Sequence, residues 1–178
     1  MYQGIRIAGF GGQGVVSAGI LLAQAGVECK KNSSWLPSYG PEMRGGTANC
    51  NVILSDTPVG SPIVQHPNVL MVMNNPSLDK YEDTVAPGGK IFVDSTLIGR
   101  KVRRTDVEAY YIPATGLAGE MGVPTLANML LLGALVEKTG CVRFDSIAPA
   151  LHKVIPARKA DLFDVNMKAV EAGKAYQG

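Results

Sequence analysis

A chain of 178 residues with 46% hydrophobic and 18% charged residues is typical of a globular protein with a sizeable core and argues against disorder. The formal net charge of +2 is too small to indicate nucleic acid or an anionic membrane surface as a partner. We therefore expect one domain over residues 1–178 that binds neither nucleic acid nor membrane.

The cysteines Cys29, Cys50 and Cys141 are scattered and odd in number, and no two form a C-x-x-C pair. A local zinc or iron–sulfur motif is therefore missing, and a reducing compartment is the plain inference. The chain begins without a charged segment followed by a long apolar run, so we expect no signal peptide. The longest apolar stretch, residues 129–136, is too short to cross a bilayer. The sequence thus predicts a cytoplasmic protein.

Strand and helix patterns alternate along the N-terminal part. Residues 5–8 are typical of a short buried strand, and apolar residues recur at helical spacing from Val15 to Gly26, where the glycine is a plausible helix stop. Residues 33–36 are compatible with a second strand. Residues 47–54 alternate between apolar and polar side chains, as in a half-exposed strand.

Buried-strand patterns continue at residues 69–73, 90–95 and 109–112, with a helix predicted between them at 76–85. The remainder is mostly helical, with helices expected over 126–139, from a cap at Asp145 to about Val154, and over 159–176. Alternating strands and helices predict an α/β fold, a Rossmann-like doubly wound and mostly parallel sheet with flanking helices.

Gly9, Gly11 and Gly14 match G-x-G-x-x-G between the first strand and the first helix. In this pattern the first glycine permits a tight turn, the second lets a phosphate approach the backbone, and the third lets helix and strand pack closely. The helix N-terminus presents unpaired N–H groups to an anion. The loop therefore favours a phosphate-bearing ligand; the alternative is a tight turn that binds nothing.

A dinucleotide site needs an acidic residue about 20 residues further on, at the end of the second strand. Glu28 comes too early, and the second strand leads into Leu36-Pro37-Ser38 instead. The missing acid weakens the case for NAD.

A second loop, residues 38–46, reads Ser-Tyr-Gly-Pro-Glu-Met-Arg-Gly-Gly and follows the second strand. We expect it beside the glycine loop, at the edge where open α/β sheets bind ligands. Arg44 offers a planar fork of donors suited to phosphate or carboxylate. The alternative is a surface loop held by a contact between Glu42 and Arg44.

Together the two loops resemble the gamma subunit of the 2-oxoacid:ferredoxin oxidoreductases, of the 2-oxoglutarate or 2-oxoisovalerate type. The matching segments are Gly9-Phe10-Gly11-Gly12-Gln13-Gly14, residues 38–46, Ser55-Asp56 followed by Ser61-Pro62, and Ala127-Asn128-Met129 ahead of Leu132-Gly133-Ala134. The resemblance covers nearly the whole chain, and the string at residues 38–46 is far more specific than a glycine fingerprint.

The resemblance implies a complex that oxidatively decarboxylates a 2-oxoacid, transfers the acyl group to coenzyme A (CoA) and passes two electrons to ferredoxin. Thiamine diphosphate, its Mg²⁺ and the iron–sulfur clusters would lie on partner subunits, namely alpha and beta, with a ferredoxin-like delta subunit left open. The gamma-type domain would contribute part of the CoA site and a wall near the active centre, and no catalytic or metal-binding residue of its own.

By the same resemblance, Gly9, Gly11, Gly12, Gln13 and Gly14 would face CoA phosphates, and Asn128 would add an amide contact. Arg44 is added from its loop position and chemistry. Asn128 has the alternative role of a simple helix-terminus residue.

Several other polar residues keep two interpretations. Asp94 and Ser95 end a strand and reach the ligand edge or, as we favour, cap the next turn. Asn74-Asn75 lies on the same edge. The basic cluster Arg100-Lys101-Arg103-Arg104 is a solvated turn or a phosphate or partner contact. Two functions besides the complex stay open: a free-standing NAD(P)-binding dehydrogenase or sensor, and a structural subunit whose glycine loop is vestigial.

Overall fold

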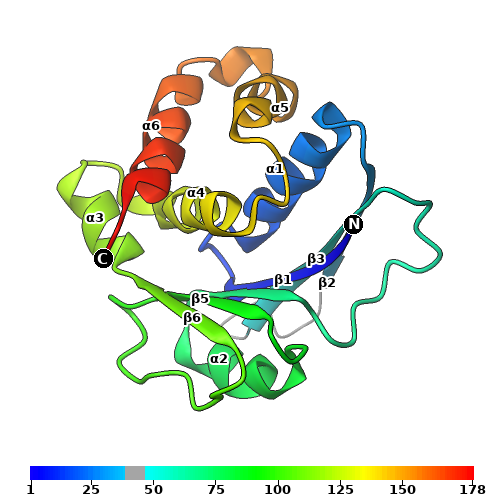
Figure 1. Ribbon diagram of the computed structural model, residues 1–178. Coiled ribbons are helices and arrows are strands. Elements are labelled where there is room, and N and C mark those ends of the chain that lie inside the picture. Colours follow the sequence, from blue (N-terminus) through cyan, green and yellow to red (C-terminus); the bar gives the residue numbers. More distant parts are fainter. Residues whose placement is uncertain (39–46) are drawn as a thin grey trace.

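The computed structural model describes residues 1–38 and 47–178, and over these residues helices lie against both faces of a six-stranded sheet (Figure 1). The strands are β1 (Tyr2–Phe10), β2 (Asn32–Ser38), β3 (Thr47–Ser55), β4 (Val69–Val72), β5 (Lys90–Asp94) and β6 (Glu108–Ile112). The helices are α1 (Val15–Glu28), α2 (Asn75–Tyr81), α3 (Ala114–Glu120), α4 (Ala127–Thr139), α5 (Ile147–Val154) and α6 (Leu162–Ala175). Short 3₁₀ turns are η2 (Glu82–Thr84), η3 (Pro124–Leu126), η4 (Phe144–Ser146) and η5 (Ala157–Lys159).

The strand order is β2-β3-β1-β4-β5-β6, and β1, β4, β5 and β6 run parallel. The predicted α/β class with flanking helices is confirmed. One strand departs from a purely parallel sheet, because β3 is antiparallel to both β1 and β2. The eight residues between β2 and β3 are too few for a crossover, which needs about a dozen, so these strands pair as a hairpin. The hairpin places β2 at the sheet edge, one strand away from β1.

Alternation along the central strands sends side chains into two apolar layers. Ile5, Ile7 and Met71 point to the face covered by α1, α4, α5 and α6, where the larger core cluster lies. Leu70 and Val72 point to the opposite face and pack in a smaller cluster with α2. Side chains that alternate along buried strands therefore fix which helices cover which face.

Helix α1 does not stop at Gly26, as the sequence predicts, but continues to Glu28. A Cβ at Gly26 would collide with Leu54 Cδ2 and with Ser33 Oγ. The glycine therefore serves the close packing of α1 on β2 and β3 rather than a helix end. Lys30, with φ of 59°, takes the left-handed conformation that follows the helix.

The predicted cap at Asp145 is also wrong. Asp145 accepts a hydrogen bond from Arg143 Nε at 3.1 Å and lies within η4, while α5 begins at Ile147 without a side-chain cap. Helix α3 lies in a part of the chain that the sequence patterns left without an assigned element. Its seven residues are too short to show a helical period clearly.

Helices α4 and α6 meet through two glycines. A Cβ at Gly133 would overlap the Val170 carbonyl, and a Cβ at Gly173 would overlap the Leu130 carbonyl. Their backbones therefore pack directly against each other. Across residues 1–38 and 47–178, no helix has the length and apolar character needed to span a bilayer.

Candidate functional site

The glycine loop connects β1 to α1, the place in the fold that its sequence predicts. Gly12 has φ of 91°, and Gly14, the N-cap of α1, has φ of 76°; both lie in the left-handed region that only glycine enters without strain. Since Gly14 has no side chain, it cannot accept hydrogen bonds from the first-turn N–H groups of α1. These groups and the positive end of the helix dipole are an arrangement suited to an anion.

An open hollow of about 360 Å³ lies over this loop. Its walls come from the end of β1, the first turn of α1 and the start of β3; they are formed by Phe10, Gly11, Gly12, Gly14, Val15, Val16, Ser17 and Ala48. Three of the five predicted loop residues, Gly11, Gly12 and Gly14, thus line the hollow, whereas Gly9 and Gln13 do not, and the wall is mostly backbone and small side chains. A hollow of this kind admits a phosphate group close to the main chain.

Gln13 and Asn128 lie behind the loop and hold its backbone. Gln13 Oε1 accepts a hydrogen bond from the Phe10 N–H at 2.6 Å, and its Nε2 donates to the Met73 carbonyl oxygen at 3.0 Å. Asn128 begins the buried helix α4, is 3% exposed, and donates from Nδ2 to the Gly14 carbonyl oxygen at 2.9 Å. The structure therefore brings both predicted residues to the loop, with their amides engaged from the inner side. Asn128 Oδ1 has no hydrogen-bond partner among the described residues.

Arg44 lies outside the described residues. The strands that flank its segment are ordered against the loop, because Thr47 pairs with Phe10 and Ser38 pairs with Asn49. Strand β3 therefore begins beside the end of β1, and β2 ends one strand further out.

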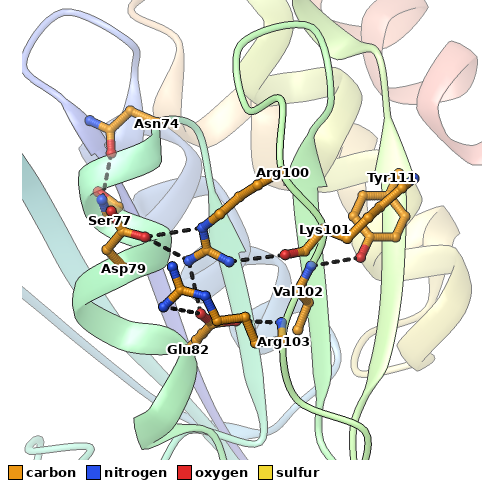
Figure 2. Close-up of polar contacts among 9 residues, drawn as sticks. All are labelled: Asn74, Ser77, Asp79, Glu82, Arg100, Lys101, Val102, Arg103 and Tyr111. Carbon is orange, nitrogen blue, oxygen red and sulfur yellow. Dashed lines mark hydrogen bonds and ion pairs between the residues drawn. The ribbon is translucent and has the colours of Figure 1, made fainter.

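Two further residues at this edge serve helix starts. Asp94 is fully buried and accepts hydrogen bonds from Thr115 Oγ1 at 2.5 Å and from the Thr96 N–H at 3.1 Å, so the favoured interpretation as a cap is confirmed. Asn74 caps α2 by accepting from the Ser77 N–H at 2.8 Å (Figure 2). Its Nδ2 has no partner within the described part of the chain.

The basic cluster at residues 100–104 is largely neutralised inside the protein (Figure 2). Arg100 Nη2 lies 2.8 Å from Glu82 Oε1 and 2.7 Å from Asp79 Oδ1, and Glu82 is 1% exposed. Glu82 Oε2 also accepts from the Arg103 N–H at 3.0 Å. Arg104 contacts Asp106 and the carbonyl oxygens of Glu82 and Val85. This network fastens the segment before β6 to the end of α2, which makes the cluster chiefly structural; the Arg103 side chain remains 73% exposed.

Burial makes the thiols of two cysteines unreactive. Cys50 is fully buried on β3, as predicted, and desolvation raises the pKa of its thiol to about 12. Burial also raises the pKa of the Cys141 thiol, which follows α4. Neither sulfur is presented as a thiolate at neutral pH.

The fold and the loop define the class: an α/β domain with a glycine loop and helix N-terminus suited to a phosphate-bearing ligand. The family model described as pyruvate ferredoxin/flavodoxin oxidoreductase matches residues 4–176. The chain belongs to this family.

Curated relatives agree with this assignment. The 2-oxoglutarate synthase subunit KorC of Methanocaldococcus jannaschii is 38% identical, over 88% of this chain and 85% of that protein. The ketoisovalerate oxidoreductase subunit VorA of Methanothermobacter thermautotrophicus is 43% identical over 97% of this chain. The chain spans 36% of that VorA protein and 35% of its Methanothermobacter marburgensis counterpart.

Solved structures share the fold. The gamma subunit of the keto/oxoacid ferredoxin oxidoreductase from Geobacter sulfurreducens superposes with a TM-score of 0.85 at 30% identity, covering 97% of this chain and 94% of that chain. The 2-oxoglutarate:ferredoxin oxidoreductase from Magnetococcus marinus, solved with 2-oxoglutarate, coenzyme A and succinyl-CoA bound, has a TM-score of 0.84 at 24% identity. It covers 98% of this chain and 30% of that chain, and this likeness concerns the fold.

Proposed function

We propose that this chain is the gamma subunit of a thiamine-diphosphate-dependent 2-oxoacid:ferredoxin oxidoreductase complex. The complex would convert a 2-oxoacid and CoA to acyl-CoA and CO₂ and pass two electrons to ferredoxin. The observation that carries the proposal is family membership over residues 4–176, in a chain whose glycine loop has left-handed backbone at Gly12 and Gly14. The chain would contribute to the CoA site and to the wall of the active centre, while the chemistry occurs on its partners.

The loop fits the phosphates of CoA. The hollow of about 360 Å³ exposes backbone at Gly11 and Gly12 and adjoins the first turn of α1. CoA carries phosphates without the free ribose 2′,3′-diol pattern that an acidic residue recognises in NAD, so its site needs no acid after the second strand. Arg44, in the segment that follows β2 in sequence, would supply a cation to the same phosphates.

In this proposal, thiamine diphosphate, its Mg²⁺ and the iron–sulfur clusters belong to partner subunits, namely alpha and beta, with a ferredoxin-like delta subunit left open. Thiamine diphosphate supplies the carbanion chemistry in this proposal. Two of the three cysteines of this chain are buried on separate elements, Cys50 on β3 and Cys141 after α4. Within the described residues, no group of three or more His, Cys, Asp or Glu side chains could hold a metal ion.

The 2-oxoacid is proposed to be 2-oxoglutarate or a branched-chain acid. The relatives named for ketoisovalerate and 2-oxoglutarate are 43% and 38% identical to this chain, against 32% for the pyruvate synthase subunit PorC of Methanothermobacter thermautotrophicus. An NAD(P)-dependent dehydrogenase is the less favoured function. Strand β3 separates β2 from β1, so the end of β2 does not stand beside the glycine loop as a dinucleotide site requires.

Reconstitution of the complex tests the proposal. Co-expression with the partner subunits should yield a complex that reduces ferredoxin with a 2-oxoacid and CoA, whereas the isolated chain should show no turnover. In the complex, Gly11→Leu should raise the KM for CoA, because the leucine side chain would occupy the hollow. Gly60→Leu, at an exposed glycine with open space around it, is the matched control. Full activity of the isolated chain, or an unchanged KM in an assembled Gly11→Leu complex, would refute the proposal.

A further inference from the structure

The side chain of Gln13 turns back beneath the glycine loop and bonds at both of its polar ends. Oε1 accepts from the Phe10 N–H at 2.6 Å, and Nε2 donates to the Met73 carbonyl oxygen at 3.0 Å. The Gln13 backbone N–H also donates to the Phe10 carbonyl oxygen at 3.2 Å. One side chain thus joins the last residue of β1 to the residue that follows β4. We refer to these two side-chain hydrogen bonds as the Gln13 bridge.

Gly9 gives the Gln13 bridge its room. A Cβ at Gly9 would lie 2.6 Å from Gln13 Oε1, and 3.1 Å from both Met73 Cβ and Val15 Cγ2. Unlike Gly12, Gly9 has no left-handed backbone that would require glycine. The absence of a side chain at this position is therefore explained by the amide that passes over it.

A Gln13 side chain that reached outward to a ligand would have to break both hydrogen bonds. The Met73 carbonyl would lose its partner at a part-buried position, which is unfavourable for a backbone group, and the exposed Phe10 N–H would lose its acceptor within the loop. On the other side of the loop, Asn128 donates to the Gly14 carbonyl oxygen and fixes the start of α1 in the same manner. The loop is held from within at both of its ends.

We propose that Gln13 is a positioning residue, which holds the glycine loop against β4 in the conformation that binds the CoA phosphates, without touching the ligand. This inference rests on the proposed function for the identity of the ligand. A loop ordered in advance loses less conformational freedom when the ligand binds, so the Gln13 bridge contributes to affinity for CoA rather than to the rate of the chemical step.

Two variants of the chain, in the assembled complex, should have the same effect by different routes. Gln13→Met keeps the approximate length of the side chain and removes both hydrogen bonds. Gly9→Ala keeps Gln13 and displaces its Oε1 with a methyl group. Each should raise the KM for CoA about tenfold, the effect of one or two lost hydrogen bonds, with kcat within about twofold of the parent. Gln24→Met, which removes a surface amide bonded to Glu28 on α1, is the matched control and should change neither constant.

Amide hydrogen exchange of the same complexes, without CoA, separates positioning from contact. In peptides that cover residues 5–15, both variants should increase the exchange rate of the Phe10 N–H by about tenfold or more, because its acceptor is lost or moved. A raised KM for CoA with unchanged Phe10 exchange would mean that Gln13 touches the ligand, and would overturn the inference. An unchanged KM with faster exchange, or equal losses in kcat, would overturn it too. If Gly11→Leu raises the KM and Gln13→Met does not, this inference fails while the proposed function stands.

Discussion

The buried carboxylate of Glu82 is predicted to contribute far more to stability than the exposed carboxylate that shares its arginine. Glu82 is 1% exposed, pairs with Arg100 at 2.8 Å and accepts from the Arg103 N–H at 3.0 Å. The Asp79 side chain is 57% exposed and lies 2.7 Å from the same guanidinium group. Both pairs connect the segment before β6 to the region of α2 and η2, but solvent screens the carboxylate of Asp79, whereas the carboxylate of Glu82 is buried.

Removing one partner of a buried ion pair typically costs about 3–5 kcal/mol, whereas exposed pairs contribute about 0–1 kcal/mol. For a domain of this size, we therefore expect Glu82→Gln to lower the melting temperature by roughly 6–20 °C and Asp79→Asn by at most about 4 °C. Urea unfolding at neutral pH, followed by circular dichroism, measures both free energies of unfolding. The m-value should stay constant. Equal losses in the two variants would refute the reasoning, because burial would then make no difference to the pair.

Three further predictions concern packing, thiol reactivity and pH. Gly173→Ala places a methyl group on the Leu130 carbonyl, so overpacking should cost at least about 1–3 kcal/mol in urea unfolding. Cys50, whose thiol pKa is raised to about 12 by burial, should resist iodoacetamide in the native protein at pH 8, where only about one thiol in ten thousand is ionised, and should react after unfolding. The hydrogen bond from Arg104 lowers the pKa of Asp106, so its stabilising contribution is present at neutral pH and is lost as the pH falls through the lowered value. The melting temperatures of Asp106→Asn and the parent should therefore converge as the pH falls below the ordinary range of an aspartate.

Each of these has a contrary result. Gly119→Ala, at an open position, is the control for the glycine variant, and an equal loss there would contradict the packing argument. Peptide mapping that finds Cys50 alkylated in the native chain would contradict its burial. A gap between Asp106→Asn and the parent that widens in acid would reverse the sign of the linkage.

Local patterns predicted much of the fold, because buried strands and turn residues depend on near neighbours. The run at residues 69–73 became β4, and the alternation at 47–54 became β3 with one further residue. The position of β3 between β1 and β2 was not predictable from its own residues. It depends on the pairing of Thr47 with Phe10, which are far apart in the sequence. Periodic patterns describe only neighbouring residues and do not predict such a pairing.

The errors at Gly26 and Asp145 have the same origin. Both residues suit helix ends by their intrinsic preferences, yet tertiary packing decides their roles. Gly26 admits Leu54 of β3 to the surface of α1, and Asp145 is engaged by Arg143. Intrinsic propensity says which conformations a residue can adopt, whereas its tertiary contacts decide which of them it adopts.

The sequence predicted which residues lie at the candidate site better than it predicted where their side chains point. The glycine motif identified Gly14 and the resemblance to the family added Gly12, and the left-handed backbone at both positions explains the glycine there. The resemblance to the family drew attention to Gln13 and Asn128, and the structure shows both amides bonded to the loop backbone. Side-chain direction depends on available backbone partners, which a one-dimensional motif does not contain.

Glu82 was missed, although the sequence held a signal. It shares a helical face with Leu78, Tyr81 and Val85, at spacings of three and four residues. A carboxylate on an apolar face predicts a buried cationic partner. The partner, Arg100, belongs to the basic cluster for which the sequence left a solvated turn or a phosphate or partner contact open. The structure shows that the carboxylate of Glu82 and this cluster form one ion pair.

The close packing of α4 on α6 at Gly133 and Gly173 has a consequence beyond the two helices. It locks α6 to α4 backbone against backbone, and α4 carries Asn128, which holds Gly14. Helix α6 therefore supports the glycine loop indirectly, through α4. A change that loosens α6 on α4 would therefore be felt at the loop between β1 and α1.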